Sequence, residues 1–380
     1  MTTTLAGLAF TANARTFADT IGWVAKHLPH KPTHPITAGI LLTVADGQVN
    51  ASAFDYDTAV TATLGIDSDT AGRVLVPGKF LADVTKTFPD KPVTVTTTDT
   101  TMVVTCGTAK LTLPLMVVED YPALPATPPT VGTIAAVDLA ALIARVGVAA
   151  DVAGNKGLEF LRGIHLTFGD TLEATASDRY RAAVGVATWQ PVAGGAETAL
   201  VPAGMLIDAA KTLDGAGNVT VSCDANLLGL AADGRHVTTR LMNNQFPIHA
   251  TRTFFPGRSE HPATVPTRDL IAALKRADLV RADKTAPVVL EFHGGGDVVT
   301  VGAHSGGTAA VTDEQVACDY DGDPVTVRFN PLYLADALTA LRSERAELHI
   351  THEYRPVQVT SPDDADLAYQ HTVVPIRSLS

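Results

Sequence analysis

The sequence is poor in the residues that mark secreted and membrane proteins. It has only three cysteines among 380 residues, Cys106, Cys223 and Cys318, which stand more than 90 residues apart without a Cys-x-x-Cys pair. This usage favours a reduced, cytoplasmic protein. No apolar run approaches the roughly 18 residues of a membrane helix. The first residues, MTTTLAGLAFTANARTF, show no basic stretch followed by an apolar one, so we expect no export signal.

Positive charge is also scarce, because 28 Lys and Arg stand against 40 Asp and Glu, for a net charge of −12. Phosphate binding needs clustered Lys and Arg, so the average charge argues against a nucleic-acid partner. Apolar residues make up 46% of the chain, enough for substantial cores. Since single cores rarely grow past about 250–300 residues, the length predicts two or three domains.

The chain contains three copies of one pattern. Residues 73–88, 198–213 and 325–341 each read as a short strand, a Pro or Asn, and an apolar-periodic helix. Each helix carries an aspartate at the same offset, Asp83, Asp208 and Asp336, with spacings of 125 and 128 residues. A period this long is far above that of solenoid repeats, so each copy can be a separate domain.

Two further sets of segments keep the same period. FDYDTAV, SDRYRAAV and HSGGTAAV end at Val60, Val184 and Val311, and each unit closes on an apolar segment, the last being VVPIRSLS. Pro- and Thr-rich linkers separate the copies. We therefore predict three domains, at 1–128, 129–258 and 259–380.

Each predicted domain has two helices in a strand-rich, α+β background. The six helix windows are 16–28, 78–88, 138–147, 203–212, 267–280 and 331–344, with Asp138 and Thr267 as candidate N-caps. These windows hold nine basic and eight acidic residues, so they sum to +1, whereas the remainder of the chain sums to −13. The separation permits helices that face DNA and acidic sheets that face solvent, although ordinary solvated helix faces explain it equally well.

The motifs resemble those of the bacterial sliding clamp family, the DNA polymerase III beta subunit, over essentially the whole chain. KPTHPITAGILL, VPGKFLADV, EDYPALP, RGIHL, ASDRYRAAV, VPAGML, FNPLYLADAL and the closing VVPIR stand in the order of the family's motifs. No single motif is diagnostic. Their order and their agreement with the triplication are specific.

The resemblance implies three clamp domains, each with two helices packed on antiparallel sheets, that form a half-ring. Two chains would join head to tail as a homodimer and encircle duplex DNA without regard to sequence, since topological linkage replaces affinity. Lys31, Lys79, Asn155 and Lys156 match DNA-facing positions, the last two only loosely. Leu111 and Leu113 of one chain would meet Leu279 and Val280 of the other.

The resemblance also implies a pocket for short extended peptides from the replicative polymerase catalytic subunit, the clamp loader and repair proteins. Its residues would be Leu161, Ser177, Arg179, Tyr180, Arg181, Ala182, Pro247, Tyr333, Val357, Val373, Val374, Pro375, Ile376 and Arg377. Arg181 and Arg377 would orient the peptide. Ala182 and Thr372 replace residues that are usually Leu and aliphatic in the family, and the turn at 246–256 is longer than usual.

Catalytic and metal-binding alternatives find little support. His27, His30 and His34 are separated by prolines, DYDGD at 319–323 lacks the spacing of a calcium loop, and HGGGD at 293–297 suits a hairpin. We find no GxSxG, P-loop or HExxH motif, and expect no cofactor, no metal and no enzymatic activity. Three readings remain: a processivity clamp, a divergent second copy resistant to a pocket-directed inhibitor, and a non-DNA scaffold. A hydrolase with an unrecognised site is a weaker fourth.

Overall fold

The computed structural model describes residues 7–68, 70–154, 157–281, 283–304, 311–364 and 368–377. The chain divides into two compact units, Met1–Thr133 with Gly215–Arg240, and Ile134–Asp214 with Leu241–Ser380. No helix in the described part is long and apolar enough to cross a membrane. The first of the two compact units is unit 1 and the second is unit 2.

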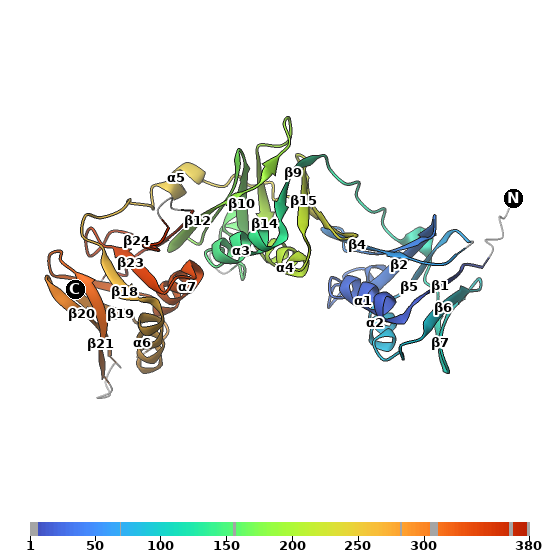
Figure 1. Ribbon diagram of the computed structural model, residues 1–380, viewed down its shortest axis with the longest axis horizontal. Helices are drawn as coiled ribbons and strands as arrows, with labels where there is room; N and C mark the ends of the chain where they lie inside the picture. The colour runs from blue at the N-terminus through green and yellow to red at the C-terminus, as the bar shows by residue number, and fades with distance from the viewer. Residues whose placement is uncertain are drawn as a thin grey trace. The chain divides into compact units, whose positions relative to one another are not determined.

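Unit 1 consists of two antiparallel sheets and two helices (Figure 1). One sheet has the order β1-β6-β7-β8, and the other runs β9-β15-β16-β17-β4-β3-β2-β5. Helices α1 and α2 pack against each other beside these sheets. The elements are β1 (Ala9–Asn13), α1 (Ala14–Ala25), β2 (Gly39–Ala45), β3 (Gln48–Phe54), β4 (Thr58–Gly65), β5 (Gly72–Pro77), α2 (Gly78–Thr85), β6 (Pro92–Thr97), β7 (Thr101–Cys106), β8 (Ala109–Pro114), β9 (Thr130–Ala135), β15 (Asn218–Cys223), β16 (Leu227–Ala232) and β17 (Arg235–Arg240).

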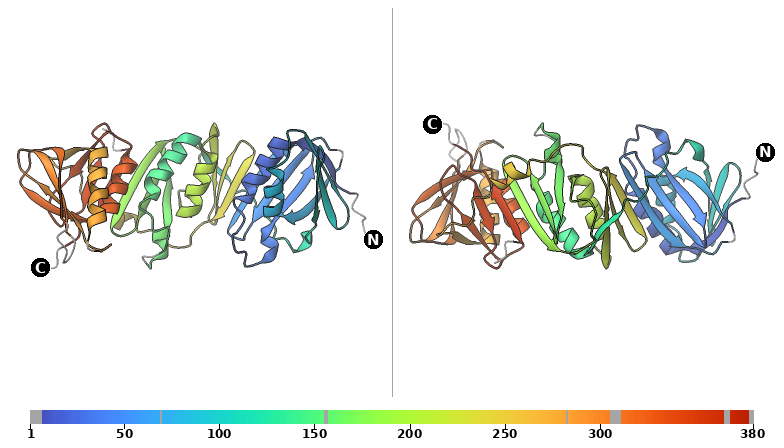
Figure 2. Two further views of the ribbon diagram at one scale, coloured as in Figure 1. Left: turned by 90° about the horizontal axis from the view of Figure 1, so that it is seen from below. Right: turned by 90° about the horizontal axis from the view of Figure 1, so that it is seen from above.

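Unit 2 contains two helix pairs, α3 with α4 and α6 with α7, and one extended sheet of order β14-β10-β11-β12-β25-β24-β23-β18-β21-β20-β19-β22 (Figures 1 and 2). Its elements are α3 (Ala136–Gly147), β10 (Gly163–Phe168), β11 (Thr171–Ser177), β12 (Arg181–Thr188), β13 (Gln190–Pro191), β14 (Thr198–Pro202), α4 (Ala203–Leu213), α5 (Ile248–Arg252), β18 (Ala263–Pro266), α6 (Thr267–Val280), β19 (Val288–Phe292), β20 (Gly296–His304), β21 (Val311–Tyr320), β22 (Val325–Phe329), α7 (Pro331–Leu341), β23 (Arg345–His349), β24 (Val357–Thr360) and β25 (Tyr369–Val373).

One main-chain hydrogen bond recurs in all three sequence copies. The N–H of Met116 donates to the Leu75 carbonyl (2.8 Å), that of Met242 to Leu200 (2.9 Å), and that of Ile376 to Arg328 (2.7 Å). Each accepting carbonyl lies on the strand that leads into the second helix of its copy, β5, β14 or β22. The predicted repeat is therefore also a repeat of local structure.

The six predicted helices are present with shifted ends, as α1, α2, α3, α4, α6 and α7. Within the described residues there is a seventh, α5, which lies in the long turn at 246–256. The predicted N-caps were wrong, because the caps are Ala135 and Pro266. Each helix follows its strand without a linker, so Asp138 lies inside the first turn, where its charge still favours the helix dipole. HGGGD forms the predicted hairpin between β19 and β20.

The predicted domain boundaries stay a prediction, and the compact units divide the chain differently. Strands β15, β16 and β17 follow the second repeat's helices in sequence but belong to unit 1. Their place follows from pairing, since β17 and β4 form an antiparallel ladder from Arg235 opposite Ala62 to Thr239 opposite Thr58.

Close backbone packing at the start of α2 generates a stability prediction. A Cβ atom on Gly78 would lie 2.5 Å from Ile40 Cγ1 and 2.6 Å from Leu28 Cδ1. Gly78→Ala should therefore lower the free energy of unfolding by about 1–3 kcal/mol, the usual cost of overpacking. In Gly22→Ala, on α1, the nearest atom is 3.7 Å away, and improved helix propensity should leave stability equal or higher. Urea denaturation of both variants tests the contrast, and equal midpoints would contradict it.

Candidate functional site

A tight turn between β11 and β12 begins the predicted peptide site. The Asp178 carboxylate is 2% exposed and accepts from the backbone N–H groups of Tyr180 (3.0 Å) and Arg181 (3.1 Å). The Ser177 hydroxyl donates to the Arg181 carbonyl at 2.9 Å. Arg179 has φ +79°, in the left-handed region, so these side-chain bonds hold a turn that the backbone alone disfavours.

Arg181 connects this turn to helix α7. Its Nε lies 3.2 Å from Asp178 Oδ2 and its Nη1 lies 2.7 Å from Asp336 Oδ2. The guanidinium carbon stands 4.5 Å from the centre of the Tyr333 ring. Tyr180 stacks on the same ring with centroids 6.2 Å apart. Because two carboxylates hold its guanidinium, Arg181 is fixed beside the Tyr333 ring on which Tyr180 stacks.

The C-terminal segment completes the site. Strand β25 pairs with β12, with Val373 opposite Arg181, and with β24, where Val373 lies opposite Val357. Beyond it, the Val374 N–H donates to the Tyr180 carbonyl at 2.8 Å. The next residue, Pro375, has no N–H, and the Ile376 N–H after it donates to the Arg328 carbonyl. A residue without an N–H fits here because regular pairing has ended at Val373, as the sequence predicted.

The predicted pocket residues lie on two faces of these strands. The Tyr369 hydroxyl donates to the Arg145 carbonyl of α3 at 2.8 Å, so β25 turns Tyr369, His371 and Val373 toward the helices. Val357 shares that face because it lies directly opposite Val373. Alternation turns Thr372 and Val374 to the other face. Ala182 lies on this second face because it is directly opposite Thr372, and Ser177 lies there because it is directly opposite Ala182.

Burial differs widely among these residues. Leu161, Ser177, Arg181, Ala182, Val357, Val373 and Pro375 are buried, Tyr333, Val374 and Ile376 are partly buried, and Arg179, Tyr180, Pro247 and Arg377 are exposed. Pro247 is the N-cap of α5, and Arg252 at the other end of that helix forms an ion pair with Glu173 (3.0 Å). The long turn is thus tied to β11.

A buried polar chain beneath the site was missed by sequence reasoning. The Tyr369 hydroxyl also lies 2.9 Å from His371 Nδ1, and the Arg145 guanidinium lies 4.1 Å from the Tyr369 ring centre. Burial, and then the nearby Arg181 charge, lower the pKa of His371 to about 3. Burial raises the pKa of Tyr369. Both groups are therefore neutral at physiological pH. In the sequence, Tyr369 and His371 are linked only by their spacing of two residues on one strand, and nothing marks Arg145 as their neighbour.

The other predicted residues are placed as follows. Lys31 and Lys79 are exposed, whereas Asn155 and Lys156 lie outside the described residues. Leu279 is 85% exposed, Val280 and Leu111 are partly buried, and Leu113 is only 2% exposed. Leu113 therefore packs mainly inside unit 1, because it faces the sheet interior on β8.

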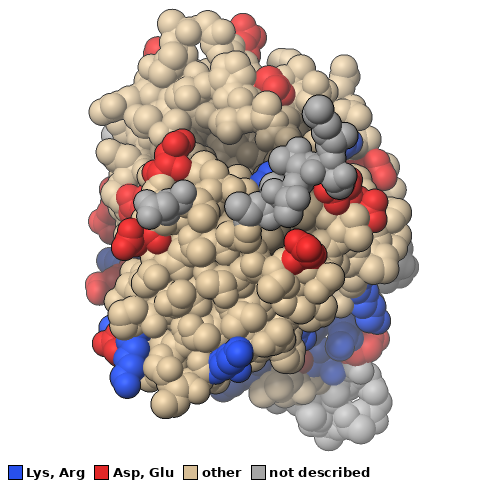
Figure 3. Space-filling model, turned by 90° about the vertical axis from the view of Figure 1, so that its right-hand side faces the viewer, with Lys and Arg blue, Asp and Glu red and all other residues tan. Residues whose placement is uncertain are grey.

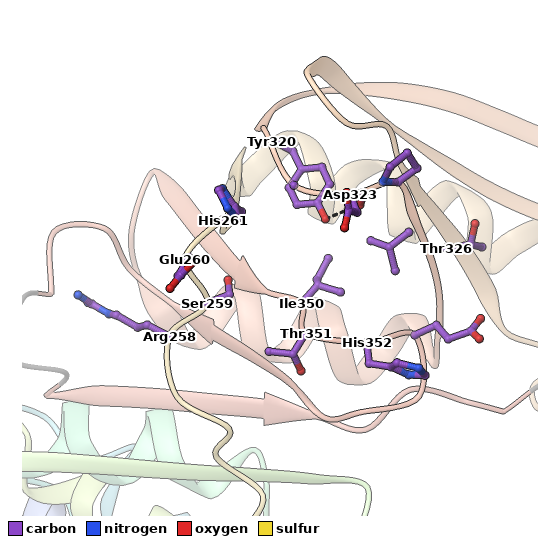
Figure 4. A pocket seen from close by; sticks show the side chains of 14 residues that line it. Arg258, Ser259, Glu260, His261, Tyr320, Asp323, Thr326, Ile350, Thr351 and His352 are labelled. Carbon is purple, nitrogen blue, oxygen red and sulfur yellow. Dashed lines mark hydrogen bonds between the residues drawn. The ribbon is translucent and has the colours of Figure 1, made fainter.

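A cavity of about 730 Å³, away from the predicted peptide site, lies in the third repeat (Figure 4). Tyr320 and Ile350 are buried in its wall, and the segments 258–261, 322–326 and 350–353 surround them. His261 at its rim pairs with Asp321 at 2.9 Å. Over the described residues, no three His, Cys, Asp or Glu side chains gather as a metal site would require.

Burial of His371 predicts a loss of stability in acid. Its folded pKa is about 3 and its ordinary value is 6.5, so unfolding takes up a proton whenever the pH is below 6.5. The stabilisation is complete above pH 6.5 and is lost as the pH falls toward 3. Between pH 6.5 and 5 the contribution is about 2 kcal/mol. Urea unfolding should show a steeper decline from pH 7 to 5 for the natural chain than for His371→Asn. Parallel declines would contradict the assignment.

Three family models together match nearly the whole chain. They are the DNA polymerase III beta subunit N-terminal domain at residues 8–125, its central domain at 133–248 and its C-terminal domain at 252–377. The beta sliding clamp of Streptomyces coelicolor is 33% identical over 95% of this chain and 96% of its own. The beta sliding clamp homolog GriR of Streptomyces muensis is 30% identical over 97% and 99%.

Solved clamps share the fold at lower identity. The Pseudomonas aeruginosa sliding clamp bound to griselimycin matches with a TM-score of 0.90 and 20% identity, over 98% of this chain and 100% of its own. The Bacillus subtilis clamp matches with the same score, identity and coverage. With three domain models in order and a relative at 33% identity along almost the full length, the chain belongs to the DNA polymerase III beta subunit family, the bacterial beta sliding clamps.

Proposed function

We propose that two copies of this chain close head to tail into a ring around duplex DNA, and that the ring tethers the replicative polymerase and other proteins without chemistry of its own. Family membership along the full chain carries the proposal. A ring holds DNA by topology, so a net charge of −12 is no obstacle. The site of action would be the cytoplasm. A non-DNA scaffold of the same fold is the alternative.

The surfaces that would join two chains are suited to association. In unit 1, β8 is the terminal strand of its sheet, and in unit 2, β21 meets β18 only at Asp319 opposite Thr264. Both leave main-chain groups for intermolecular pairing. The side of unit 1 that carries β6 and β7 shows few charges at its centre (Figure 3). Leu279 on α6 of unit 2 is 85% exposed and would be buried against this side of unit 1 in a second chain.

Ring closure can be tested at the exposed end of α6. Leu279→Asp with Val280→Asp should give monomers, because two charges would be buried in an apolar interface. Analytical ultracentrifugation measures the mass. The natural chain should also stay on nicked circular DNA and slide off linear DNA, and the variant should be retained on neither. A variant that remains dimeric would mean that the interface lies elsewhere. A dimer that distinguishes no DNA topology would favour the scaffold.

Contacts with DNA should be few and electrostatic. Lys31 and Lys79 are exposed, so Lys31→Glu with Lys79→Glu should weaken loading on circular DNA and reduce its salt dependence without unfolding the chain. The matched control reverses Lys91 and Arg355, which are exposed outside the helices. Salt titrations of loaded clamp provide the measurement. If both pairs behave alike, net charge and not position determines retention.

Partner tethering would use the surface beside the C-terminal segment. Tyr180, Tyr333 and the partly buried Val374 and Ile376 offer aromatic and apolar contact for an extended peptide. The Tyr180 N–H donates to Asp178, the Val374 N–H to the Tyr180 carbonyl and the Ile376 N–H to the Arg328 carbonyl, which holds this backbone in place. Sites of this kind place a few apolar anchors in preformed pockets. Duplex DNA would occupy a separate surface, since the ring encloses it.

Charges on this surface should weaken peptide capture. Val374→Asp with Ile376→Asp should weaken binding of a peptide ending in Leu-Phe at least tenfold, because a buried apolar side chain contributes about 1.5–3 kcal/mol. Val117→Asp, at a 55% exposed residue of unit 1, is the control. Fluorescence anisotropy measures the affinity. Undiminished binding by a folded, dimeric double variant would place the peptide site elsewhere.

A divergent second clamp copy is the other candidate within the same family. Ala182 and Thr372, which depart from the residues expected at this site, lie directly opposite each other on β12 and β25. Griselimycin is bound by one clamp of this fold, that of Pseudomonas aeruginosa. Weaker griselimycin binding by this chain than by Ala182→Leu with Thr372→Val would favour the second copy, and equal binding would remove it.

A further inference from the structure

The cavity of about 730 Å³ in the third repeat lies at a free edge of unit 2's sheet (Figure 4). Strand β22 is the last strand of that sheet and pairs with β19 on one side only. Val325 and Thr326, the first two residues of β22, form part of the cavity wall. The wall of this cavity therefore includes the edge of a sheet.

The main-chain groups of Thr326 point away from β19. The Arg328 carbonyl accepts from the N–H of Ile376, a residue that belongs to no strand and lies outside the sheet. In an antiparallel strand the N–H and C=O of one residue point to the same side, and residues two apart share that side. Thr326 therefore directs both groups outward, and within the described residues neither has a hydrogen-bond partner. Such an edge can pair with an extended peptide.

The floor of the cavity is apolar and held in place. Tyr320 is 6% exposed and Ile350 is 8% exposed. The Tyr320 hydroxyl donates to the Asp323 carbonyl at 2.7 Å, so its polar atom is already satisfied (Figure 4). In the opposite wall, the Ser259 N–H donates to Nδ1 of the buried His349 at 3.2 Å. A preformed, apolar floor of this kind suits an apolar side chain.

The rim of the cavity has an excess of unpaired negative charge. The Arg258 guanidinium donates to the Asp364 carbonyl at 2.9 Å, and Figure 4 shows this side chain directed away from the cavity centre. His261 Nδ1 lies 2.9 Å from Asp321 Oδ1. Because these cations are held by other groups, the rim favours a ligand that brings positive charge of its own. Three lining residues have carboxylates that form no ion pair within the described part of the chain, namely Glu260, Asp323 and Glu353.

We propose that this cavity is a second peptide-binding site, called the edge site, which takes an extended segment paired with β22 at Thr326. An apolar residue of the segment packs against Tyr320 and Ile350. Basic residues two positions before and after it share its face of the strand, about 7 Å away, and meet the carboxylates of the rim. Main-chain hydrogen bonds supply affinity and the cavity selects the side chain. The edge site depends neither on ring closure nor on the peptide site proposed above.

Fluorescein-labelled Lys-Thr-Leu-Thr-Lys is the probe, because its Leu and both Lys lie on one face of a strand. In anisotropy titrations, the full chain should bind it more tightly than Glu-Thr-Leu-Thr-Glu, which reverses the charge, and Lys-Thr-Ser-Thr-Lys, which lacks the apolar residue. N-methylation of the Leu and both Thr amides blocks strand pairing and should weaken binding about fivefold or more, the effect of one hydrogen bond. A methylated peptide that binds as well as the probe would overturn the proposal.

Two sets of variants locate the binding. Glu260→Gln with Glu353→Gln should weaken probe binding about fivefold, as expected for the loss of two exposed ion pairs. Asp208→Asn with Glu344→Gln, a matched pair of exposed acids outside the cavity, should stay within about twofold of the natural chain because salt screens distant charges. Thr326→Pro removes the outward N–H but no ladder bond, and should also weaken binding about fivefold. Thr326→Val keeps the N–H and should bind normally.

Equal weakening by the two acid pairs would reduce the attraction to net charge, and equal binding by Thr326→Pro and Thr326→Val would exclude strand pairing. Either result overturns the proposal, as does a natural chain that fails to bind the probe. If Thr326→Pro does not fold, the methylated peptide decides the same point. Glu260→Gln with Glu353→Gln should still capture the peptide ending in Leu-Phe, so failure of the edge site would leave the proposed function standing.

Discussion

The antiparallel ladders that join one sequence repeat to the next are the constraint on which the rest of this structure depends. Strand β17 of the second repeat pairs with β4 of the first, and β12 of the second pairs with β25 of the third. Each ladder satisfies main-chain groups that would otherwise form exposed edges. The repeats are thereby joined by hydrogen bonds as well as by linkers, and the proposed peptide site lies at the second of these ladders.

The second ladder explains why the site is built from distant parts of the chain. Arg181 at the start of β12 lies opposite Val373 at the end of β25, so the β11–β12 turn and the C-terminal segment meet there. Arg181 then connects the turn to α7 through Asp336 and the Tyr333 ring. Buried or partly buried ion pairs of this kind stabilise little by themselves, but they fix geometry. A peptide would therefore meet aromatic rings that are already oriented.

Buried polar side chains lie on both faces of the sheet at this ladder. Tyr369, His371 and Arg145 form one chain toward the helices, and Thr372 and Gln358 lie on the opposite face. Burial keeps His371 neutral, which makes this part of the fold sensitive to acid. The C-terminal repeat thus combines structural and proposed binding roles in a single strand, and substitutions in β25 will affect both.

The sequence by itself determined the triplication, the α+β class, the helix windows and the family. Those features are local or periodic, and apolar spacing, Pro and Gly record them directly, as with Asp83, Asp208 and Asp336. The helix caps and α5 were missed because strands run straight into helices and because a five-residue helix has no periodic signal. Tertiary structure alone decided that Arg181 forms an ion pair with Asp336, that Leu113 is buried, and that Thr372 lies directly opposite Ala182 on the neighbouring strand. These are long-range pairings, and strand register, which no local pattern encodes, assigns each side chain its face and its neighbour.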